Sequence, residues 1–294
     1  MIVIGASLIA AFLLAVAFVM QQHAAARAPA DERLSFRLLV DLAQRPLWLG
    51  GIGVMVLGQL FGAYALSKGK LTVVEPLLAA NLLFALPMAA IWSRQKLRLR
   101  EWAGAVILMG GLAMFVVAAG PQAAQATRVS DENWLIAGLT IVFVVGAIVA
   151  LAKRTSLAEE ATLLALGAGI LYGLQDGLTQ RTIEIFPRGL DAVVGAWESY
   201  ALVAVAVVGL LLAQTAFEMA PLAASLPAIT LAEPLTGIAL GAGLFSQDVR
   251  LSGLALGVEM GGVVLMVLGV IMVARSPVVT GQACLLDLDR TRAG

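Results

Sequence analysis

Long apolar stretches separated by short polar connections organise this chain of 294 residues. A helix that spans a bilayer needs about 20 consecutive, mostly apolar residues. Nine segments meet that length: 2–22, 47–67, 71–92, 102–120, 133–152, 161–180, 190–213, 219–245 and 252–274. The pattern predicts an all-α, multi-pass membrane protein with about nine transmembrane helices, and its connections are too short to hold a soluble domain.

The longest connection, residues 23–46, has a pattern of its own. Leu34, Leu38 and Leu42 recur at a spacing of four, which places them on one face of a helix. Arg37 and Asp41 fall between them. This alternation predicts an amphipathic helix lying at the membrane surface.

Composition agrees with the apolar pattern. The chain is 61% hydrophobic, only 13% charged, and has a mean hydropathy of +0.95, whereas soluble domains carry about a quarter charged residues. The net charge is zero, so no basic field suggests a nucleic-acid partner. We therefore expect the lipid bilayer and a small solute or cation as partners, with a homodimer left open.

Basic residues predict the orientation of the bundle. About two-thirds of the 19 Lys and Arg residues follow the odd-numbered segments, and connections rich in these residues face the cytoplasm. We expect a cell-membrane protein with its N-terminus outside and its C-terminus, a polar tail over 276–294, in the cytoplasm.

Two halves of the chain can be aligned with each other. The alignment places Pro76 on Pro227 and, one residue out of step, Gly110 on Gly262. It predicts a first repeat of four helices over 1–120, a linking loop and helix over 121–153, and a second repeat over 154–275. Because the linking helix crosses the membrane once, the repeats are inverted, as in many secondary transporters.

Several motifs of the first repeat carry a resemblance to a known family. They are WLGG at 48–51, GQLFGAYA at 58–65, LTVVEPL at 71–77, Gly104 and the pair Gly110-Gly111. With these residues the chain resembles the drug/metabolite transporter (EamA-like) superfamily, and within it the NIPA-type magnesium transporters. The resemblance implies a nine-helix carrier that works by alternating access, with magnesium as the solute. Gln59 stands where the family has Glu.

Five acidic residues fall inside the predicted spans. Each ionised acid near the centre of a lone helix costs about 2.5–3.5 kcal/mol to insert, so intramembrane acids mark functional sites by default. We predict an acid-lined vestibule open to the outside that leads to Glu233, near the middle of its segment. Acids close to an interface can instead simply reach water. The candidate ion-binding residues are Glu75, Asp176, Glu198, Glu233 and Glu259.

Other residues inside the spans are candidates of a different kind. Polar side chains there bind solutes or hold helices together, and proline breaks helical hydrogen bonding, which exposes carbonyl groups or merely kinks the helix. The polar candidates are Gln59, Asn81 and Tyr172, and the helix-breaking ones are Pro76, Pro227 and Pro234. Two glycine stripes, 169/173/177 and 253/257/261, predict close helix contacts. Glu218 falls at a helix end, where we expect it to be solvated.

Enzyme chemistry is not indicated. His23 is the only histidine and ends the first segment, so we expect neither a histidine metal cluster nor a Ser/His/Asp triad. No phosphate-binding loop motif is present. We expect no enzyme activity, no cofactor and no fixed metal site. The function predicted is secondary transport of a small solute, with magnesium, a proton-coupled organic metabolite or drug, and a non-transporting membrane role as the alternatives.

Overall fold

A computed structural model describes residues 2–68, 74, 77–92, 99–119, 130–244 and 253–274, and every regular element in these ranges is helical. The elements are α1 (Ile2–Ala25), η1 (Ala30–Glu32), α2 (Phe36–Ala43), α3 (Pro46–Lys68), α5 (Asn81–Trp92), α6 (Leu99–Ala119), α7 (Asp131–Ala152), α8 (Leu157–Ile185), η2 (Phe186–Arg188), α9 (Leu190–Gly195), α10 (Trp197–Met219), α11 (Leu222–Leu244) and α12 (Gly253–Ala274).

The helices have the composition of membrane spans. Within the described residues, five are long and apolar enough to cross a bilayer: α1, α3, α7, α8 and α10. α5 and α12 contain shorter apolar stretches. The prediction of an all-α, membrane-embedded protein is therefore confirmed, whereas the number of nine spans stays a prediction.

The predicted segment 190–213 is divided in the structure. Residues 190–213 were expected to form one helix, but the chain breaks at Ala196, whose backbone is extended (φ −84°, ψ 132°). The short α9 precedes the break, and α10 runs from Trp197 to Met219. Gly189, with φ of 104°, introduces α9 in a conformation that favours glycine. Hydropathy missed the break because residues on both sides of it are apolar.

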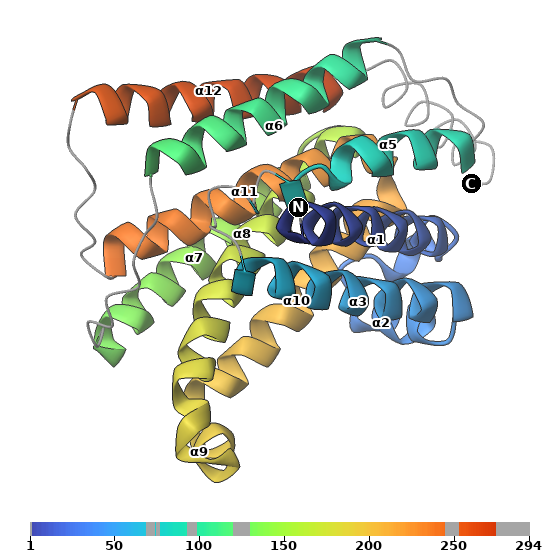
Figure 1. Cartoon of the computed structure of the whole chain (residues 1–294). Helices are drawn as coiled ribbons and strands as arrows, with labels where there is room; N and C mark the ends of the chain where they lie inside the picture. The colour runs from blue at the N-terminus through green and yellow to red at the C-terminus, as the bar shows by residue number, and fades with distance from the viewer. Residues whose placement is uncertain are drawn as a thin grey trace.

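The helices pack in pairs. α1 lies against α3, α8 lies against both α10 and α11, and α6 and α12 lie side by side along one edge of the bundle, at the top of Figure 1. At one end of the bundle, α1 and α10 finish, α3 begins and α2 packs beside them; we name this the α2 end. The opposite end, where α8 finishes and α10 begins, is the α9 end (Figure 1).

Glycine allows the closest of these pairs. A Cβ atom on Gly111 would lie 2.7 Å from the carbonyl oxygen of Gly262, and one on Gly269 would lie 2.6 Å from that of Gly104. The contact positions rise from 104 to 111 along α6 but fall from 269 to 262 along α12. The two helices are therefore antiparallel, and they touch backbone to backbone. The predicted stripe on α12 is wrong at Gly257, which faces open space. Sequence spacing alone cannot say which face of a helix meets a neighbour.

A helix with one buried face is confirmed within the predicted connection, but Leu34, expected on that face, lies before the helix with a φ of 52°. The location of this helix at a membrane surface stays a prediction. In α2, Leu38 and Leu42 are completely buried, while Phe36 and Val40 are exposed on the other face. Ser35 caps the helix by accepting a hydrogen bond from the backbone N–H of Arg37. α2 therefore seals the end of the bundle with one face and presents the other outward.

Candidate functional site

The closest approach of α8 to α11 occurs at a candidate acid. A Cβ atom on Gly173 would lie 2.5 Å from the backbone oxygen of Glu233 and 2.7 Å from Cβ of Thr236. The predicted α8 glycine stripe therefore does bring α11 into contact. Gly169 makes the equivalent approach one turn earlier, 2.7 Å from the backbone oxygen of Ile229. Since both contacts advance together along the two helices, α8 and α11 run parallel.

Glu233 occupies the midpoint of α11 and is half-buried. Tyr172 lies on α8 next to Gly173, so it adjoins the turn of α11 that holds Glu233, while its ring packs against Gly209 of α10. We name Tyr172, Glu233 and the adjoining Pro234 the Glu233 site. Sequence reasoning selected all three residues, and the close approach of α8 to α11 places them on neighbouring helical turns.

Proline changes the backbone chemistry at this site. Pro227 and Pro234 both lie inside α11, and proline has no N–H to donate to the carbonyl four residues earlier. The carbonyl of Thr230 therefore receives no helical hydrogen bond from residue 234. A carboxylate, a phenol and backbone oxygens are hard oxygen donors, which suit a cation that keeps part of its hydration shell.

Asp176 lies one helical turn from Tyr172, toward the α9 end. Protein surrounds this residue on most sides, yet its side chain is accessible to solvent. Tyr172 and Asp176 are thus two polar residues one turn apart on α8, and the acid-lined vestibule stays a prediction.

The remaining candidates lie on other elements. Glu259 is half-buried on α12, Gln59 is exposed on α3, and Asn81 begins α5 with its side-chain oxygen buried and without a hydrogen-bond partner. Glu75 and Pro76 lie outside the described residues. Among the described residues, no three His, Cys, Asp or Glu side chains come together as a metal site.

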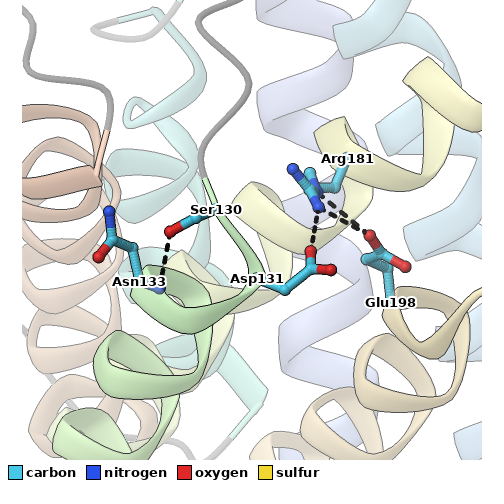
Figure 2. Close-up of polar contacts among 5 residues, drawn as sticks. All are labelled: Ser130, Asp131, Asn133, Arg181 and Glu198. Atoms are coloured by element: carbon cyan, nitrogen blue, oxygen red, sulfur yellow. Dashed lines mark hydrogen bonds and ion pairs between the residues drawn. The ribbon is translucent and has the colours of Figure 1, made fainter.

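Glu198, a candidate ion-binding acid, is paired with a cation that the sequence analysis did not identify, and its role in binding stays a prediction. Figure 2 shows its carboxylate paired with Arg181, with Nη2 to Oε1 at 3.0 Å. The same guanidinium contacts Asp131 at 2.9 Å and lies over the ring of Trp134, 5.9 Å from its centre. The reason is the length of α8, which continues past the predicted end at 180 and carries Arg181 to the start of α10.

This cluster yields a stability prediction. Removing one partner of a buried ion pair leaves an uncompensated charge and costs about 3–5 kcal/mol. Glu198 is 7% exposed and Asp131 is 74% exposed. We expect Glu198→Gln to lower the apparent melting temperature in detergent clearly, and Asp131→Asn, at a pair worth about 1 kcal/mol or less, to change it little. Equal effects from the two variants would contradict this assignment.

Glu218 was expected to be solvated at a helix end, and this is wrong. Its side chain is 6% exposed and is paired with Arg33, which comes from the connection after α1. Nearby, the fully buried Gln214 donates a hydrogen bond to Gln21 at 2.8 Å. These residues were missed as a group because they lie far apart in the sequence, although each is a polar residue in or next to an apolar segment.

Comparisons with known proteins add little to this geometry. No family model matches the chain. An uncharacterized protein of Corynebacterium glutamicum is 29% identical to it over 236 residues, which is 80% of this chain and 81% of that protein. No solved structure matches. Function must therefore be argued from the residues themselves.

Proposed function

We propose that this protein is a secondary carrier with nine transmembrane helices, which moves a small solute across the cell membrane by alternating access. The observation that carries the proposal is the Glu233 site: a half-buried acid at the midpoint of a proline-interrupted helix, where α8 and α11 touch backbone to backbone. Broken helices at mid-membrane build the solute sites of many secondary transporters.

The pairing of helices supports an inverted repeat. α1 with α3 in the first half corresponds to α8 with α10 in the second half, and both pairs are antiparallel neighbours. α6 and α12 are the last helices of their halves and meet through Gly111 and Gly262. A pseudo-two-fold axis between two inverted halves would pass through such a contact between corresponding helices.

The solute class follows from the chemistry of the site. An acid and a phenol favour a cationic solute or a proton over an anion, and magnesium is the cation that the resemblance to NIPA-type transporters suggests. Mg²⁺ usually keeps several waters and uses one or two carboxylates. One acid at the site, with Asp176 one turn further along α8, is compatible with a hydrated ion.

A proton-coupled exporter of an organic metabolite or drug is the second candidate. The observation that favours it is that the described residues gather no cluster of acids at the site. A single carboxylate next to a phenol suits a proton better than a tightly held divalent ion, because its pKa can respond to burial and to the presence of a solute.

One experiment separates these functions. We suggest a thermal-shift screen of the purified protein over divalent cations and metabolites, followed by uptake into proteoliposomes that contain a magnesium dye or a pH dye. Magnesium transport predicts a response of the magnesium dye in the proteoliposomes. It also predicts that the protein rescues growth of a host deficient in magnesium transport. The exporter predicts proton movement driven by an organic solute. If no solute stabilises the protein and neither dye responds, the carrier proposal is overturned.

A further inference from the structure

Three polar contacts join the two halves of the chain at the α2 end. Gln214 Nε2 donates to Gln21 Oε1 at 2.8 Å, and the backbone N–H of Leu34 donates to Thr215 Oγ1 at 3.3 Å. The third contact is a two-pronged ion pair between Arg33 and Glu218, in which Arg33 Nη2 and Glu218 Oε1 are 2.8 Å apart. We name these three contacts the α2-end latch.

The latch lies on one face of the last turns of α10. Gln214 and Glu218 are four residues apart and Thr215 is next to the first, so their side chains line one side of the helix. Gln214, Thr215 and the facing Gln21 are all buried. The glutamine and threonine side chains of the latch are thus enclosed by protein, whereas Arg33 is partly exposed.

The opposing side of the latch is anchored to the first half. Arg45 donates to the carbonyl oxygens of Ala24 and Arg27, at 3.0 and 3.2 Å, which fixes the connection onto the end of α1. Leu38 and Leu42 are buried beneath the same connection. Arg33 is therefore held by elements of residues 1–120, whereas Glu218 belongs to the second half.

The ion pairs at the α9 end are arranged differently. Arg181 joins α8 to Asp131 on α7 and to Glu198 on α10. All three elements lie within residues 131–219, so these two ion pairs tie the linking helix to the second half. Charged contacts between the halves are thus found at the α2 end of the described structure.

The geometry points to a gate: the α2-end latch holds that end closed, and it opens when the solute passes to that side. This inference rests on the proposed carrier function. A buried ion pair suits a reversible gate, because the attraction between its charges is largely offset by their loss of hydration. When the halves part, both groups regain water, so opening needs little net energy.

Thiol labelling tests the gate without knowledge of the solute. Cys284, the only cysteine, is first replaced by serine. Two reporters are then placed in separate proteins: Ser225→Cys, at a fully buried position in the first turn of α11 at the α2 end, and Asp176→Cys, at the exposed position toward the α9 end. Reaction with a charged maleimide in detergent reports which end is open.

Arg33→Gln leaves Glu218 buried without its cation in the latched state and so favours the open one. We expect the population of the open state, and with it the labelling rate of Ser225→Cys, to rise at least about tenfold. Labelling of Asp176→Cys should become slower. The exchanged pair Arg33→Glu with Glu218→Arg should restore both rates. Arg37→Gln, which makes the same charge change on an exposed residue of α2, should alter neither.

Three results would overturn the gate. The first is unchanged labelling in Arg33→Gln, and the second is an exchanged pair that stays as open as Arg33→Gln. The third is faster labelling at Ser225→Cys without slower labelling at Asp176→Cys, because that marks local loosening rather than exchange between two closed ends. Thiol labelling requires no transport, so it tests the gate alone. The carrier function is tested separately by the uptake assay, where a protein that moves no solute would refute it.

Discussion

Valine in place of Gly111 is expected to prevent α6 and α12 from packing and to remove most of the folded protein. A Cβ atom there would lie 2.7 Å from both the carbonyl oxygen of Gly262 and the backbone nitrogen of Met266. These are backbone atoms, which cannot rotate away, so the helices must separate. Overpacking of this kind costs about 1–3 kcal/mol or more, and the loss is measurable as the yield and apparent melting temperature of monodisperse protein in detergent.

The neighbouring glycine offers a matched control. A Cβ atom on Gly110 would meet nothing within 4 Å, so Gly110→Val adds the same side chain to the same helix without a clash. We expect this variant to purify like the wild type. If Gly110→Val and Gly111→Val lose stability equally, the harm comes from valine in the helix, and the antiparallel contact between α6 and α12 is not what holds the pair.

Glutamine in place of Glu233 is expected to reduce solute uptake by at least about tenfold, which corresponds to about 1.4 kcal/mol. The side chains have nearly the same shape, so contacts with α8 are kept, but the amide carries no charge and cannot take up a proton. Initial uptake rates in proteoliposomes measure the effect, and the melting temperature in detergent should stay close to that of the wild type.

Two further variants show whether Glu233 is the decisive acid. Asp191→Asn changes an exposed acid of α9 and should leave uptake unchanged. Glu259→Gln changes a second half-buried acid, on α12, and separates a single site from a pair. Wild-type uptake with unchanged pH dependence in both Glu233→Gln and Glu259→Gln would refute an acidic transport site.

Much of the candidate site could be predicted from the sequence because it depends on local composition. Glu233, Pro234 and Tyr172 stand out as polar or helix-breaking residues in apolar segments. What could not be predicted is which residues of other helices lie next to them. The turn of α8 that holds Tyr172 lies against the turn of α11 that holds Glu233, because Gly173 lets the two helices approach backbone to backbone. A contact of that kind depends on how two helices are rotated toward each other.

The partners of the charged residues were the least predictable feature. Glu198 was expected inside a span and Glu218 at a helix end, and a cationic side-chain partner was identified for neither. Each is paired with an arginine from another element, Arg181 and Arg33. Arg181 is placed by the length of α8, and Arg33 by the anchoring of its connection onto α1. Charge pairing follows the positions of helix ends, which hydropathy locates only to within a turn or two.

The sequence by itself determined that this is an all-α protein embedded in a membrane, and that the connection after α1 holds a helix with one buried face. The physical reason is that a segment in lipid must satisfy its own backbone hydrogen bonds, so apolar length alone selects a helix. Only the tertiary structure decided which glycines touch, that Gly173 meets the backbone of Glu233, and that the two halves are joined by charge at the α2 end. Those features arise between residues far apart in the chain, where packing, rather than local composition, selects the partners.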